Sequence, residues 1–222
     1  MFSAMHYISY NEALSDGERQ GLAEEIKAAA EATTPVNLVA VPHEGGSNDG
    51  DVICKLGFKD QAEYESAKKG QGWAELQALL GDAARVANVE FGAYDAGVCG
   101  IDNPDAKNCV HRVLMFADQE RAKPEDVAML DQLFAHFADY VPILNWRVST
   151  CVESSGSRDW KHIWEQDFES YDIFVGPYMF TPFHPTYVDT YFDTECHNWT
   201  ADPFLCTMTC DEETAFLGNY AK

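Results

Sequence analysis

The sequence predicts an α+β fold made of two tandem units, each with the order strand, helix, strand, strand, helix, strand. Two observations predict it. The pattern of residues 4–94 restarts at residues 108–210. Each copy also alternates β-rich runs with apolar stripes at helical period. A stretch rich in Gly, Asn and Asp separates the copies, as expected of a connection. We therefore expect a first unit at 1–95, a linker at 96–108 and a second unit at 109–222.

The first unit reads as four strands and two helices with clear start and stop signals. Ser15 with Glu18 is a capping-box signature for the first helix, and Pro35 ends that helix. A Gly-rich stretch at 45–50 predicts a loop. Asp60 can cap the second helix. The predicted strands are Ser3–Tyr10, Val36–Val41, Val52–Phe58 and Val86–Phe91.

The second unit repeats this order with different side chains. Pro124 suits a first helical turn, and Pro142 closes that helix as Pro35 closes its counterpart. The predicted strands are Val110–Phe116, Ile143–Val152, His162–Phe168 and Phe204–Thr209, and a second helix is expected after Pro182. By order and spacing we match His6 with His111 and Phe58 with Phe168.

Each unit is thus expected to be ferredoxin-like, with two helices on one face of an antiparallel sheet. The other sheet face needs a partner, because an exposed apolar face is costly. The second copy supplies one, so we expect the two sheets to pair within the chain into a barrel. Further homodimerisation stays open.

The charge limits the partners. The chain has 222 residues, with 37 acidic and 15 basic side chains and a net charge of −22. Such a field repels phosphates, so we expect neither nucleic acid nor an anionic membrane as a partner. No run of about 20 apolar residues is present, and the N-terminus lacks the features of a secretory signal. A cytoplasmic location is the expectation.

The seven cysteines indicate a reducing compartment rather than a disulfide framework. Two metal sites deserve weighing and neither is favoured. The four residues Cys196, His197, Cys206 and Cys210 lack zinc-site spacing, and the acidic run Asp189, Asp193 and Glu195 is typical of a solvated helix face. We expect no metal and no cofactor.

The histidines are unevenly divided between the copies. His6 stands alone in the first, where it can be a relic. His111 and His162 lie on two strands of the second copy, and His184 follows them. If both strand faces point toward the helices, His162 can act as a base while His111 and Tyr187 polarise a carbonyl. The aromatic residues expected to line such a pocket are Trp164, Phe168, Phe174, Tyr178, Phe183 and Tyr191. The alternative is that these histidines are hydrogen-bonded core residues.

The segment WKHIWEQDFESYDIFVGPYMFTPFHPTYVDTYF resembles the stress-responsive dimeric α/β-barrel (Dabb) domain. His162, the aromatic Phe168 and the box His184-Pro185-Thr186-Tyr187-Val188 stand where that family has a strand histidine, an aromatic residue and HPxHV. His111 matches a strand histidine found in part of the family. MHYISY and DVICKLGFKDQAEY carry a weaker resemblance in the first copy.

The resemblance implies a small apolar or aromatic ligand, with His162, His111, Tyr187 and His184 as site residues. One branch, resembling olivetolic acid cyclase, closes polyketide rings, which implies a cofactor-free lyase or cyclase. Tyr187 replaces the second histidine of the box, so that mechanism does not carry over directly. Two alternatives remain: a non-catalytic ligand-binding or stress-response protein, and a haem-type monooxygenase with His184 as haem ligand. No nucleotide-binding or serine-hydrolase motif is present.

Overall fold

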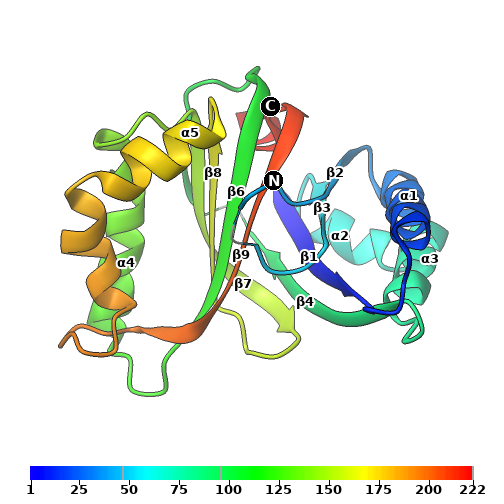
Figure 1. Cartoon of the computed structure of the whole chain (residues 1–222), viewed down its shortest axis with the longest axis horizontal. Coiled ribbons are helices and arrows are strands. Elements are labelled where there is room, and N and C mark those ends of the chain that lie inside the picture. The colour runs from blue at the N-terminus through cyan, green and yellow to red at the C-terminus, as the bar shows by residue number, and fades with distance from the viewer. Residues whose placement is uncertain (47, 96, 222) are drawn as a thin grey trace.

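The computed structural model describes residues 1–46, 48–95 and 97–221. Ser47, in the predicted loop at 45–50, and Ala96, at the start of the predicted linker, lie outside the described residues. The strands form one curved sheet, with α1 to α3 on one side and α4 and α5 on the other (Figure 1). This is the α+β architecture of two paired ferredoxin-like units that the sequence predicts.

The first unit follows the predicted order closely. Its elements are β1 (Phe2–Tyr10), α1 (Asp16–Thr33), β2 (Val36–Ala40), β3 (Val52–Phe58), α2 (Gln61–Ala67), α3 (Gln71–Leu80) and β4 (Val86–Tyr94). The capping box at Ser15 and Glu18 is present, and Asp60 caps α2. Sequence signals at helix ends therefore place this half well.

The second unit departs from the prediction in two places. Its elements are β5 (Val98–Ile101), β6 (Lys107–Asp118), α4 (Pro124–His136), the 3₁₀ turn η1 (Phe137–Asp139), β7 (Asn145–Ser155), β8 (His162–Phe168), α5 (Tyr171–Ile173), η2 (Phe174–Tyr178), η3 (His184–Val188), η4 (Asp189–Tyr191), β9 (Ala201–Thr214) and η5 (Phe216–Ala221).

The first departure is that the predicted linker holds β5, which pairs with β7. The second lies after β8, where short turns replace a regular helix. η2 and η3 are π-helical and contain Pro177 and Pro185. Proline lacks the N–H that regular helical hydrogen bonding needs, which explains the broken path.

The sheet runs in the order β2-β3-β1-β4-β7-β8-β6-β9, and every pairing is antiparallel. β4 pairs with β7 and so joins the two units. The loop after β2 reaches β9, where His43 N donates to Thr209 O at 2.7 Å and Asp49 N donates to Thr207 O at 2.8 Å. The sheet is therefore a nearly closed barrel.

The apolar core has three main layers. One lies between the first sheet half and its helices, one lies over the second half, and one fills part of the barrel interior. Among the described residues, no helix has both the length and the apolar character needed to cross a membrane.

The strand register corrects one sequence match. Phe2 pairs with Phe58 in the first unit, and Val110 pairs with Phe168 in the second. Since Phe58 and Phe168 correspond, Phe2 corresponds to Val110. His111 then matches Ser3, and His6 matches Leu114. The prediction that His6 matches His111 is wrong by three positions, which is enough to reverse the face.

Candidate functional site

His111 and His162 lie on opposite faces of the sheet. Register sets His111 opposite Asp167 and His162 opposite Phe116. The His162 ring stacks on Phe116 in the layer beneath the helices, with 4.7 Å between ring centroids. His111 points into the barrel, where it meets Lys55 of the first unit. The expectation of a shared face for the two imidazoles is therefore wrong.

Two carboxylates hold His162. Its Nε2 lies 2.9 Å from Asp118 Oδ1, and its Nδ1 lies 3.4 Å from Asp131 Oδ1. Burial lowers the pKa of His162, but the hydrogen bonds and charges of these aspartates outweigh it and raise the pKa to about 9. The ring is thus an imidazolium at neutral pH, and an imidazolium has no lone pair with which to act as a base.

His184 and Tyr187 lie apart from both strand histidines. His184 Nδ1 pairs with Asp189 Oδ1 at 2.9 Å, and its ring packs edge-on against Phe137 and Tyr178. Burial lowers the pKa of His184 despite Asp189. Tyr187 is 53% exposed. The HPxH-like box therefore supplies one partly buried histidine and one exposed tyrosine, and neither joins the strand histidines in a common site.

The predicted lining residues form packed core. Trp164 stacks on Phe134 with 4.0 Å between ring centroids, and Tyr178 stacks on Phe137 at 4.7 Å. Arg112 Nη1 donates to Tyr178 Oη at 3.1 Å and to Gln166 Oε1 at 2.9 Å. The remaining rings of the expected pocket wall join the same cluster: Phe168, Phe174, Phe183 and Tyr191.

The corresponding space in the first unit holds a cavity of about 390 Å³. It lies between α3 and the strands β1, β4 and β7, at the seam between the units. Its walls are His6, Lys68, Trp73, Gln77, Leu80, Gly81, Val89, Phe91, Glu153 and Ser155. A cavity of this size suits a small molecule of two or three rings.

His6 is the notable polar group of this cavity. It is 2% exposed, and its Nδ1 has no hydrogen-bond partner among the described residues. Its ring centroid lies 4.8 Å from that of Phe91 and 6.0 Å from that of Trp73. Burial lowers its pKa to about 4 against a smaller opposing effect of the Cys54 backbone, so the imidazole is neutral at physiological pH. An unpartnered buried polar atom in a cavity wall indicates a ligand or a water.

Charged and phenolic groups meet at the edge of the same cavity. Lys68 Nζ lies 3.0 Å from Glu153 Oε2, and Tyr64 Oη donates to the same oxygen at 2.9 Å. Glu153 belongs to β7, whereas Lys68 and Tyr64 belong to the first unit. The cavity is therefore completed by both halves of the chain.

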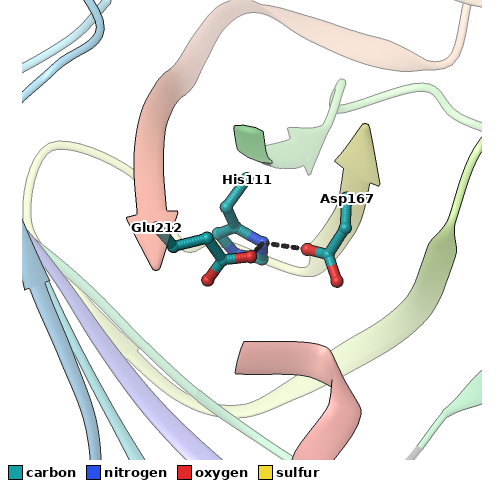
Figure 2. A group of neighbouring side chains, drawn as sticks. All are labelled: His111, Asp167 and Glu212. Carbon is teal, nitrogen blue, oxygen red and sulfur yellow. Dashed lines mark hydrogen bonds and ion pairs between the residues drawn. The ribbon is translucent and has the colours of Figure 1, made fainter. Parts of the chain in front are cut away.

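The barrel interior holds a second polar group of side chains. Lys55 Nζ lies 2.7 Å from His111 Nε2 and forms a close ion pair with Glu165 Oε1. Figure 2 shows the contact between His111 and Asp167, in which Nδ1 and Oδ1 are 2.7 Å apart. All four residues are fully buried. Their partners fix the tautomer: Nδ1 donates to the aspartate and Nε2 accepts from the lysine.

Further polar residues surround this chain of contacts. Asn145 Nδ2 donates to Asp167 Oδ2 at 2.9 Å, and Phe216 N donates to Glu212 Oε2 at 3.0 Å. Burial and the charge of Asp167 raise the pKa of Glu212 to about 9. Burial and Lys55 lower that of His111. Burial acts against the charge of Glu165, but Lys55 and Arg147 lower its pKa. The sequence predicts neither Lys55 nor Glu165 as part of a site.

A search of protein-family models found no match to the chain, and a search of curated proteins found none either. Solved structures do match. An anthrone oxidase-like protein superposes with a TM-score of 0.67 at 11% identity, covering 95% of this chain and 90% of its own. A candidate monooxygenase from Fusobacterium nucleatum gives a TM-score of 0.58 at 9% identity, covering 96% and 91%.

A chlorite dismutase from Candidatus Nitrospira defluvii also matches, with a TM-score of 0.52 at 12% identity, covering 100% of this chain and 95% of its own. These likenesses show the fold. The chain has the dimeric α/β-barrel architecture, with both units on one polypeptide. The narrower resemblance to the Dabb family stays a prediction.

Proposed function

We propose that the protein binds a flat, apolar or aromatic molecule that carries a hydroxyl or carbonyl group, in the cavity beside His6. The observation that carries this proposal is the unpartnered Nδ1 of a neutral, buried imidazole in the wall of a cavity of about 390 Å³. Trp73 and Phe91 supply flat apolar surface.

The chemistry we propose is proton transfer next to a carbonyl, without a cofactor. A neutral imidazole accepts a hydrogen bond from an O–H group. A pKa of about 4 makes His6 a weak base in the empty cavity. Negative charge that develops on a bound ligand would raise the pKa of His6, because an opposite charge stabilises the imidazolium. Proton transfer is then coupled to binding.

This proposal keeps the cyclase or lyase chemistry expected from the sequence and moves it to the first unit. The names of the structural neighbours give it a substrate class to test, since an anthrone is an aromatic ketone. They also motivate an oxygen-dependent arm, because several are named as monooxygenases or oxidase-like. Binding without turnover is the alternative outcome.

Binding can be tested by tryptophan fluorescence titration with 2-naphthol and naphthalene, which differ by one hydroxyl. We expect the wild type to prefer 2-naphthol by up to about tenfold, the effect of one hydrogen bond. His6→Gln and His6→Leu should lose that preference, whereas His184→Gln should keep it. An unchanged preference in both His6 variants would refute the site.

Turnover can be tested with anthrone in D₂O, following deuterium incorporation next to the carbonyl by NMR. We expect faster exchange with wild type than with His6→Gln. Parallel samples with and without oxygen separate simple proton transfer from oxidation. If 2-naphthol binds but exchange is no faster than in buffer, the protein is a binding protein.

A further inference from the structure

Three potential metal ligands from three strands converge inside the barrel. His111 comes from β6, Asp167 from β8 and Glu212 from β9 (Figure 2). One ligand atom from each lies within 4.8 Å of the others, and all three residues are buried. One imidazole nitrogen and two carboxylate oxygens suit a divalent first-row ion such as Zn²⁺, Co²⁺ or Mn²⁺. We propose that this cluster is a site for such an ion.

The second atom of each ligand is held by another residue. Asn145 Nδ2 bonds Asp167 Oδ2 at 2.9 Å, Phe216 N bonds Glu212 Oε2 at 3.0 Å, and Lys55 Nζ lies 2.7 Å from His111 Nε2. The Asn145 amide and the Phe216 N–H are outer partners of the kind that orient carboxylate ligands in metal sites. They leave His111 Nδ1 2.7 Å from Asp167 Oδ1 and 3.9 Å from Glu212 Oε1. These three atoms therefore face one another, and Cys109 Sγ also donates to Glu212 Oε1 at 3.5 Å.

The ligand set would match the charge of a divalent ion. The Nδ1 proton would move to His111 Nε2 as the metal binds at Nδ1, so the imidazole would stay neutral. The Lys55 ammonium would then turn fully toward Glu165, its ion-pair partner. Two ionised carboxylates, Asp167 and Glu212, would balance the charge of one divalent ion, as a dry interior requires.

This site is separate from the His6 cavity. The metal ligands face the barrel interior, whereas His6 faces Trp73 of α3 in the first unit. The two proposals can therefore fail independently. The cluster also draws on both units, since Lys55 comes from β3.

The test is the metal content of protein expressed in media supplemented with zinc, cobalt or manganese and then passed through gel filtration. We expect about one ion per wild-type chain for at least one of the three metals, as for a structural site. Asp167→Asn and Glu212→Gln should lose that ion. Asp189→Asn, which alters the His184–Asp189 pair outside the barrel, is the matched control and should retain it. Wild type without bound metal in all three media, or unchanged content in Asp167→Asn/Glu212→Gln, would overturn the proposal.

A second measurement does not depend on variants that alter the core. X-ray absorption of zinc-loaded wild type should show only nitrogen and oxygen neighbours at about 2.0–2.2 Å, with imidazole scattering. Sulfur at about 2.3 Å would place the ion at cysteines instead and would also overturn the assignment.

Discussion

The two units share one strand order and one register but use the two faces of their sheets differently. In the first unit, the space between sheet and α3 holds a cavity with one neutral histidine. In the second, the matching space is filled by stacked rings around Trp164. The buried polar side chains His111, Glu165 and Asp167 of the second unit instead lie in the barrel interior, close to Lys55.

The difference follows from local sequence. α3 is a regular helix whose apolar residues recur at helical spacing, so one face of it packs toward the first sheet. The segment 171–191 contains Pro177 and Pro185, and its path is a series of short π-helical and 3₁₀ turns. Its rings reach down onto the second sheet and occupy the space. The two units share the scaffold, and they differ in how the space beside their second helical segment is filled.

The largest effect should come from opening the packed space. Trp164→Ala removes a buried indole that stacks on Phe134, and should cost about 3–5 kcal/mol of unfolding free energy. Trp73→Ala removes a ring that already borders the cavity, and should cost less. Urea denaturation of both variants measures the contrast. Equal losses would mean that the two spaces are packed alike.

Next comes the buried ion pair that crosses between the units. Lys55→Met should cost about 3–5 kcal/mol, because it removes the close counter-charge of a fully buried carboxylate. Lys55→Met/Glu165→Leu should recover much of that loss. A double-mutant cycle by urea denaturation gives the coupling. A double variant as unstable as the sum of the singles would show that the pair acts separately.

A pH-dependent effect should belong to the second unit. The pKa of His162 is raised to about 9, so its stabilising contribution is complete below the ordinary value of about 6.5 and is lost as pH rises through 9. We expect a loss on the order of 2 kcal/mol, discounted because Asp118 and Asp131 are partly exposed. The position of His162 is occupied by Val52 in the first unit, which therefore lacks this pH-dependent contribution.

Unfolding free energy measured between pH 6 and pH 10 tests this. Asp118→Asn/Asp131→Asn should make the decline shallower by the His162 contribution, and Glu212, whose pKa is also raised to about 9, should supply the decline that remains. Asp189→Asn should leave the profile unchanged. A wild-type profile that is already flat would contradict the assignment.

The smallest effect on stability should come from His6→Leu, which installs the residue found at the matching position of the second unit, Leu114. His6 lacks a partner at Nδ1, so the change should shift the unfolding free energy by less than about 1 kcal/mol. The same variant should lose the 2-naphthol preference. A large loss of stability would show that His6 is a structural hydrogen-bonding residue.

The fold could be predicted because its signals are local. Ser15 and Glu18, Asp60, Pro124 and the period-two strands each specify one boundary or one face. β5 escaped prediction because Gly, Asn and Asp dominate its surroundings, and its pairing with β7 is a tertiary contact.

The site could be predicted less well, because a strand reverses its face with every residue. The match of His6 with His111 was off by three positions, which reverses the face. Lys55 lies in an apolar strand, where the sequence shows one isolated charge. Its partners come from another unit, and no local pattern names them. The cavity at His6 exists because no side chain from a neighbouring element fills it. That is a property of tertiary packing, which no local sequence pattern shows.

Lys55 and Glu165 each lie three residues before the matched Phe58 and Phe168, so they occupy the same position in the two copies. In a symmetric dimer of identical units, that position would confront its own twin, lysine with lysine or glutamate with glutamate. Opposite charges at one structural position therefore require two distinguishable copies. The pair makes the two units complementary in charge. Two first units that met would bring two ammonium groups together in a dry barrel. The ion pair at the centre of the barrel therefore favours the pairing of a first unit with a second unit over the pairing of two first units.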